Sequence, residues 1–169
     1  LLKGFLEERE DAALLSEILT IPSEATLFAR LKNVDIQSLI AAREALLKQI
    51  AQSGEIYFLE IYQSLNNINN LFSSENAGKR ALRNLCLAYL NELKNKQYVK
   101  LAEAQFEQSA NMTEQFAALT ILVAHENGEN ALNAFYEKWQ NEALVVDKWL
   151  SVQAASRAPN TLEKVRELT

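Results

Sequence analysis

The stretch ALRNLCLAYLNEL, residues 81–93, decides the fold class of this chain. Its larger apolar residues recur at positions i, i+3, i+4, i+7 and i+11: Leu82, Leu85, Cys86, Tyr89 and Leu93. This spacing places them on one face of an α-helix. We therefore expect a helix with this face buried, and we expect the first four residues of the series to anchor the core.

The same periodicity recurs along nearly the whole chain, and no segment alternates convincingly as a strand would. We expect helices over residues 9–20, 23–32, 35–53, 55–66, 77–94, 97–108, 113–125, 129–140, 143–156 and 160–169. About ten helices with short connections predict an all-α fold. Because no fixed repeat length is present, we expect an irregular α-solenoid of layered antiparallel helix pairs.

Start and stop signals separate these segments. The expected N-terminal caps are Ser23, Asp35, Asn111 with Glu114, and Asn160 with Glu163. Gly54, Gly78 and Gly128 fall in or beside expected connections. Residues 66–78 form the most loop-like segment, but the apolar stripes on both sides favour a single helical domain over residues 1–169.

Composition narrows the classes of function. The chain has 169 residues, of which 49% are hydrophobic, and only two prolines and four glycines. Its net charge of −5 disfavours binding to nucleic acid phosphates, and no apolar run is long enough to span a membrane. The one cysteine has no partner for an internal disulfide, which is typical of a cytoplasmic protein.

The two ends of the sequence predict a piece of a longer protein. The first residue is Leu1, and the only methionine is Met112. The last segment, residues 160–169, carries an apolar stripe formed by Leu162, Val165 and Leu168. Because the last layer of a helical array needs a polar outer face, we expect self-association through this segment.

Three short motifs carry candidate chemistry. HENGE, residues 125–129, begins like the zinc-peptidase signature H-E-x-x-H, but its fifth residue is Glu129 and the chain has no second histidine. We interpret it as a helix end, with His125 in the last turn and Gly128 as terminator. No catalytic, metal-binding or substrate-binding residue is assigned in this chain.

Cys86 and the basic motif GKRALRN, residues 78–84, are the other two candidates. Cys86 would need a nearby base to act as a nucleophile, and its apolar neighbours favour a core position. The basic side chains of Lys79, Arg80 and Arg83 would suit an anion or carboxylate clamp. The alternative is a solvated helix face, or pairing with acidic groups on a neighbouring helix.

Both tryptophans, Trp139 and Trp149, fall within the segment YEKWQNEALVVDKWL, residues 136–150. Each lies on the apolar stripe of a predicted helix, and the short link between the helices allows them to fold back on each other. We expect both rings to be largely buried structural anchors, with Lys138 and Lys148 remaining in solvent. An exposed platform for an aromatic ligand is the alternative.

This segment also carries a family resemblance. YEKWQNEALVVDKWLSVQAAS (136–156), GKRALRNLCLAYL (78–90) and ANMTEQFAALTILVA (110–124) closely resemble the C-terminal helical domain of bacterial aminopeptidase N, the alanyl aminopeptidases of the gluzincin clan. SEILTIPSEA (16–25) is similar more loosely. The stretches follow the order of that family, so the resemblance covers nearly the whole chain.

The resemblance implies a zinc exopeptidase that removes N-terminal residues from peptides. Its H-E-x-x-H motif, its distant glutamate ligand, its G-A-M-E-N-type loop and its tyrosine would lie in a catalytic domain outside this chain. This chain would pack against that domain and help to enclose the active-site cavity, with zinc only in the parent protein. The alternatives are a free-standing helical scaffold for protein interactions and, third, a hydrolase that uses Cys86.

Overall fold

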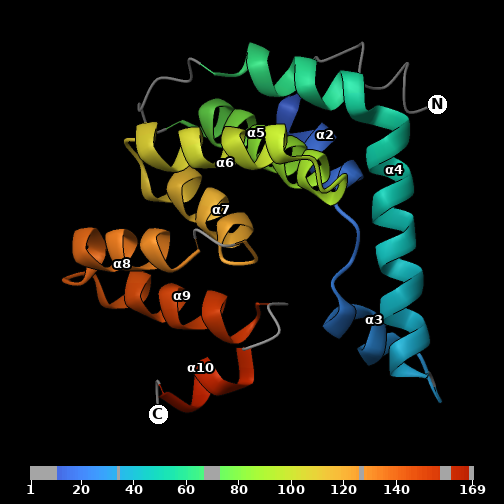
Figure 1. Ribbon diagram of the computed structural model, residues 1–169. Coiled ribbons are helices and arrows are strands. Elements are labelled where there is room, and N and C mark those ends of the chain that lie inside the picture. The colour runs from blue at the N-terminus through green and yellow to red at the C-terminus, as the bar shows by residue number, and fades with distance from the viewer. Residues whose placement is uncertain (1–10, 34, 67–72, 126–127, 157–160, 168–169) are drawn as a thin grey trace. The chain divides into compact units, whose positions relative to one another are not determined.

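The computed structural model describes the chain except for residues 1–10, 34, 67–72, 126–127, 157–160 and 168–169 (Figure 1). The described residues form the helices α2 (Ala12–Leu19), α3 (Glu24–Arg30), α4 (Ile36–Ser64), α5 (Ser74–Glu92), α6 (Lys96–Gln108), α7 (Met112–Leu122), α8 (Gly128–Trp139), α9 (Ala143–Ala154) and α10 (Thr161–Glu167). No strand occurs among these residues. The prediction of an all-α fold is confirmed.

Several helix starts lie where the capping residues predict them. Asp35 accepts hydrogen bonds from the backbone N–H groups of Gln37 and Ser38 at the start of α4. Asn111 accepts from the N–H of Glu114, and its amide donates to the Glu114 carboxylate in return. The bonds that Asp35 and Asn111 accept satisfy backbone donors that the first turn of a helix leaves free, and the return bond holds the Glu114 carboxylate beside the cap. Asn160 lies outside the described residues.

The contacts within the chain divide it into two compact units, Leu1–Tyr98 and Val99–Thr169. In the first unit, α5 packs against α4 and α2. The apolar face of α5 supplies much of this core, since Leu82, Cys86 and Tyr89 are all buried. Leu85 is only half-buried, at the edge of the same face.

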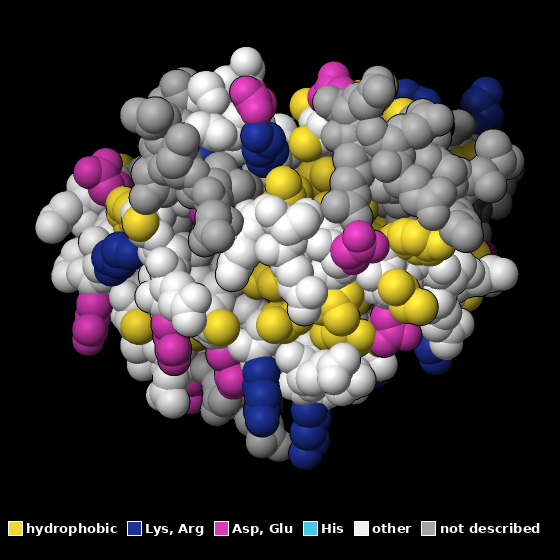
Figure 2. All heavy atoms as spheres, turned by 90° about the horizontal axis from the view of Figure 1, so that it is seen from above, with side chains coloured by type: hydrophobic (Ala, Val, Ile, Leu, Met, Phe, Trp, Pro, Cys, Tyr) yellow, Lys and Arg dark blue, Asp and Glu magenta, His cyan; other side chains and the backbone are white. Residues whose placement is uncertain are grey.

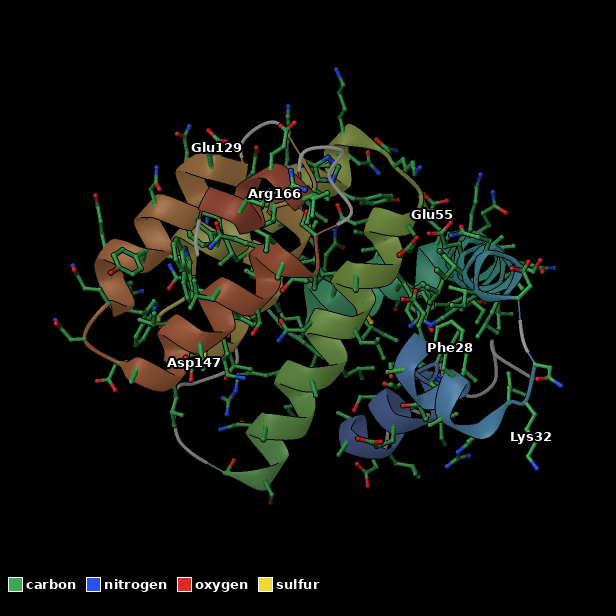
Figure 3. All side chains as sticks on the ribbon, turned by 90° about the horizontal axis from the view of Figure 1, so that it is seen from below. Phe28, Lys32, Glu55, Glu129, Asp147 and Arg166 are labelled. Atoms are coloured by element: carbon green, nitrogen blue, oxygen red, sulfur yellow. The ribbon has the colours of Figure 1, made fainter. Side chains whose placement is uncertain are left out.

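The predicted break at Gly54 is wrong, because α4 runs continuously from Ile36 to Ser64. The helix turns a corner between two straight legs (Figure 1), and Glu55 lies near this corner in Figure 3. A Ser-Gly pair, residues 53–54, is a common site for such a bend. Gly54 is buried, and a side chain there would lie 2.7 Å from the ring of Phe58. Packing of that ring therefore outweighs the low helix propensity of glycine.

Gly78 lies inside α5, as the predicted helix over residues 77–94 has it. It occupies the second turn of α5, and a Cβ atom there would lie 2.9 Å from the Cβ of Ala13 on α2. Glycine thus permits the close approach of α2 and α5. The loop-like segment predicted over residues 66–78 accordingly ends before Ser74, and residues 67–72 lie outside the described part.

In the second unit, α7, α8, α9 and α10 pack in chain order, each against the next. Its core includes Phe106, Leu119, Leu122, Leu132 and Phe135, all of which are buried. This sequential packing of short helices is the layered arrangement expected from the sequence. Val165 on α10 is half-buried and Leu162 is exposed, while Leu168 lies outside the described residues.

Candidate functional site

The described residues of the HENGE motif, His125, Gly128 and Glu129, lie after the end of α7 and at the start of α8. α7 ends at Leu122, and His125 follows it in an exposed turn. Gly128 begins α8 instead of terminating α7, and its N–H donates to the carbonyl of His125 at 3.0 Å. A Cβ atom at this position would lie 2.8 Å from the carbonyl oxygen of Leu122. Glycine therefore permits the close approach of the first residue of α8 to the end of α7, and the expected terminator role is wrong.

In the part of the chain that the structure describes, no three His, Cys, Asp or Glu side chains are grouped so that they could hold a metal ion. Catalytic zinc needs three protein ligands and one open position for water. The zinc implied by the family resemblance therefore has no ligand set among these residues.

Cys86 is fully buried in the first unit. Burial raises the pKa of its thiol to about 12, because the charged thiolate is poorly solvated there. Nucleophilic attack requires the thiolate, so this cysteine is inert at neutral pH. The structure favours the core position over the nucleophile.

The basic motif does not assemble into a clamp. Lys79 pairs with Glu75 on its own helix at 2.5 Å. Arg83 is buried, and its guanidinium carbon lies 4.7 Å from the centre of the Tyr62 ring. One Arg83 nitrogen also donates to the side-chain oxygen of Asn66 at 2.7 Å. These contacts hold the end of α4 against α5.

A cavity of about 480 Å³ lies where α2, the end of α4 and the start of α5 meet. Its polar lining includes Glu75 and Lys79, which pair with each other, and Ser64, whose hydroxyl donates to the carbonyl of Ile61. The apolar lining includes Ile61 and Leu82. Because these polar groups already have partners, the cavity offers no catalytic constellation.

Tyr89 connects three helices of the first unit. Its ring stacks on Phe58 of α4, with the ring centres 4.8 Å apart and the planes inclined by 6°. Its hydroxyl donates to the carbonyl of Leu19 at the end of α2 at 2.5 Å. Burial raises the pKa of this hydroxyl. The sequence indicated Tyr89 as an anchor but not its partner Phe58, because residue spacing within one helix does not identify the residues that it meets on another helix.

A series of cross-helix hydrogen bonds runs through the second unit. We call its four members, Gln105, Gln115, Trp139 and Trp149, the cross-helix ladder. Gln105 on α6 donates to the carbonyl of Glu114 at 3.0 Å, and Gln115 on α7 donates back to that of Phe106 at 3.2 Å. Both glutamines are buried. Buried amides that bond to the backbone in both directions fix the position of one helix against the next.

The tryptophans extend this ladder to the last helices. Trp139 on α8 donates its indole hydrogen to the side-chain oxygen of Gln115 at 2.8 Å. Trp149 on α9 donates to the carbonyl of Leu132 on α8 at 2.9 Å. Both rings are only half-buried, so the prediction that they are largely buried is too strong. Lys138 and Lys148 are exposed, as expected. The two glutamines of the ladder were missed, because single polar residues on a helix carry no sequence signal.

Acidic and basic side chains are interspersed over the face shown in Figure 2, with hydrophobic side chains between them. This mixture lacks the one-signed character of a surface that binds nucleic acid phosphates. None of the described helices is by itself long and apolar enough to cross a membrane. The pair α2 and α3 meets that test only when combined, across a bend of 61°.

The whole chain, residues 1–169, matches a protein family described as a domain of unknown function, DUF3458_C, with ARM repeats. The chain belongs to the DUF3458_C family. ARM repeats are stacked helices, in agreement with the sequential packing seen in the second unit.

Relatives of this domain include three bacterial proteins named aminopeptidase N. That of Escherichia coli is 34% identical over 165 residues, which cover 96% of this chain and 19% of that protein. The Haemophilus influenzae protein is 32% identical, and the alignment covers 94% of this chain and 18% of that protein. The Caulobacter vibrioides protein is also 32% identical, and the alignment covers 99% of this chain and 20% of that protein. The domain thus spans about a fifth of the length of these relatives. The expected resemblance to bacterial aminopeptidase N is confirmed.

A solved structure shows the same fold. The crystal structure of Legionella pneumophila aminopeptidase A in complex with aspartic acid matches this domain with a TM-score of 0.86 and 25% identity. The match covers 98% of this chain and 21% of that chain. The domain therefore resembles one part of a larger aminopeptidase in both sequence and structure.

Proposed function

We propose that this domain is a non-catalytic C-terminal helical segment of a zinc-dependent aminopeptidase that releases N-terminal amino acids from peptides in the cytoplasm. The domain packs on the catalytic domain of the same polypeptide and helps to enclose the active-site cavity. One observation carries the proposal: three proteins named aminopeptidase N align with 94–99% of the chain.

The contacts of the domain suit a supporting role. Two side chains that the sequence offered as reactive groups have structural contacts instead. Cys86 is buried, and Arg83 contacts the ring of Tyr62 and donates a hydrogen bond to Asn66. The buried amides of the cross-helix ladder fix neighbouring helices against one another. A wall that must keep its shape around a cavity benefits from such rigidity.

The test uses the full-length polypeptide that contains this domain. We expect it to hydrolyse an alanyl anilide, to lose that activity on treatment with a chelator, and to regain it with zinc. An intact polypeptide without aminopeptidase activity would contradict the proposal and favour a free-standing scaffold. A polypeptide whose activity survives complete removal of metal would contradict the zinc dependence alone.

We also propose that the two compact units act as one helical domain, and that residues 160–169 mediate self-association of the isolated domain. Leu162 is 64% exposed on α10, which supports the second part. Sedimentation analysis of the isolated domain should show concentration-dependent association that Leu162→Glu weakens. Two separate unfolding transitions, one for each unit, would contradict the single domain.

A further inference from the structure

The first leg of α4 leaves the core of its own unit. Every buried residue of this 29-residue helix belongs to its second half, beginning at Ala51. α3 has no buried residue at all. We call α3 together with residues 36–50 of α4 the α3/α4 arm. Figure 1 shows α3 beside the first leg, and Figure 3 shows Lys32 extending away from the helices.

The arm carries an apolar stripe that α3 covers only in part. Residues of this stripe on α4 include Ile36, Leu39, Ile40, Leu46, Leu47 and Ile50, and none of them is buried. Ile36 is 54% exposed and Leu46 is 47% exposed. Such spacing marks a helix face that packs against a partner.

Arg43 joins the first leg of α4 to the start of α3. Arg43 donates to the carbonyl of Pro22 at 3.0 Å and approaches Glu24 at 3.8 Å. Ion pairs at a solvent-exposed surface contribute little to stability. An isolated helix of about 15 residues is marginal in water without tertiary packing. The arm therefore needs a further surface to cover its stripe.

The charges and the apolar stripe of the α3/α4 arm favour a protein surface as its binding partner. Between residues 24 and 50 there are four basic residues (Arg30, Lys32, Arg43, Lys48) and three acidic ones (Glu24, Asp35, Glu44). This near balance does not suit phosphates, and the apolar stripe suits the centre of a protein interface. The relatives supply a candidate of sufficient size, because about four fifths of their length lies outside the aligned region.

We propose that the α3/α4 arm docks on the part of the aminopeptidase polypeptide that lies outside these 169 residues, with Ile36 and Leu46 buried in that interface. This inference rests on the proposed function and adds the surface through which the domain joins the rest of the enzyme. Ile56 lies on the second leg of the same helix, outside this stripe, and is 77% exposed.

The test is photo-crosslinking in the full-length polypeptide. Benzoylphenylalanine replaces Leu46 in one variant, Ile36 in a second and Ile56 in a matched control on the same helix. We expect positions 36 and 46 to link to peptides outside the 169 residues with about a tenfold higher yield than position 56, because the excited ketone reacts only with C–H groups in contact with it and the apolar centre of an interface supplies them. Cys86 should stay unreactive in each variant, which verifies that the fold is intact.

Other products would overturn the proposal. Links from position 46 to residues 99–169 would show that the second unit covers the arm, and links between two polypeptides would assign the face to self-association. Equal yields at all three positions, or no links from positions 36 and 46, would show that the stripe is not docked. Hydrolysis of an alanyl anilide by the unmodified protein is measured separately. An active enzyme without these links contradicts only the docking, and an inactive protein with them contradicts only the proposed activity.

Discussion

At the scale of single residues, Trp149 shows how a half-buried ring can still order a helix pair. Its indole N–H donates to the carbonyl of Leu132, and its ring lies 4.8 Å from that of Tyr136. Trp149→Phe keeps an aromatic ring but removes the donor and leaves the carbonyl without this partner. We expect a loss of about 1–2 kcal/mol in the free energy of unfolding, measured by urea titration.

Leu144→Ala is the matched control for this variant, because Leu144 lies on the same helix and is 79% exposed. Its truncation should change the free energy of unfolding by less than about 0.5 kcal/mol. Equal effects of the two substitutions would show that the indole hydrogen bond contributes nothing measurable.

Cys86 gives a pH-dependent prediction. Its thiol has an ordinary pKa of 9.0 in the unfolded chain and about 12 in the folded one. Well below pH 9 the thiol is protonated in both the folded and the unfolded chain, so its ionisation does not reduce the free energy of unfolding. As pH rises from 9 toward 12 the unfolded state alone loses the proton, so stability falls by as much as about 1.4 kcal/mol per pH unit.

The measurement is the free energy of unfolding from pH 8 to pH 11 for the native sequence and for Cys86→Ala. The substituted side chain cannot ionise, so the variant should start less stable because of the cavity but should lose less stability with pH. The difference between the two slopes isolates the thiol from Tyr89 and Tyr98, whose pKa values are also raised by burial. Identical slopes would contradict the burial of Cys86.

At the scale of elements, the capping residues were better predictors than the glycines. Asp35 and the Asn111–Glu114 pair act through bonds to their own backbone, so the sequence alone specifies them. Gly54 and Gly78 have reasons that lie elsewhere, in the ring of Phe58 and in the backbone of α2. Local rules cannot identify a glycine retained for packing between segments distant in sequence.

Gly54→Ala tests this explanation of the continuous helix. Alanine raises helix propensity by about 1 kcal/mol, but its methyl group would meet the Phe58 ring, which is held by its stacking on Tyr89. Overpacking typically costs about 1–3 kcal/mol, so we expect a net loss of stability in thermal unfolding. Ser53→Ala at the exposed neighbouring position should be neutral or slightly stabilising. A Gly54→Ala variant more stable than the native sequence would contradict the steric account.

Lys94 gives the opposite prediction, because it adopts the left-handed conformation with φ of 54° after the end of α5. This conformation costs an L-residue about 1–2 kcal/mol, and glycine avoids that strain while losing more entropy on folding. We therefore expect Lys94→Gly to raise the free energy of unfolding by up to about 1 kcal/mol. Lys100→Gly, at an exposed position inside α6, is the unfavourable reference. A Lys94→Gly variant that is destabilised in the same way would contradict this conformation.

At the scale of the whole molecule, periodicity predicted the fold class, whereas the role of the chain required its relatives. Helical stripes such as that of α5 follow directly from residue spacing. The cross-helix ladder and the α3/α4 arm depend on which helices pack against each other, and residue spacing in the sequence does not specify those contacts. The sequence excludes a two-histidine zinc site at HENGE, because the motif lacks a second histidine. That Gly128 begins α8 instead of ending α7 became evident only from the fold.

The last prediction is that the 169-residue domain alone neither retains zinc nor cleaves peptides. His125 lies in an exposed turn and Cys86 in an apolar core, and neither belongs to a group of three metal-binding side chains among the described residues. A site assembled from carboxylates would also lack the surrounding partners that orient metal ligands. Metal content after dialysis and release of a chromophore from an alanyl anilide measure the two properties together. One equivalent of retained zinc, with turnover that His125→Ala abolishes, would assign catalysis to this domain and replace the supporting role proposed for it.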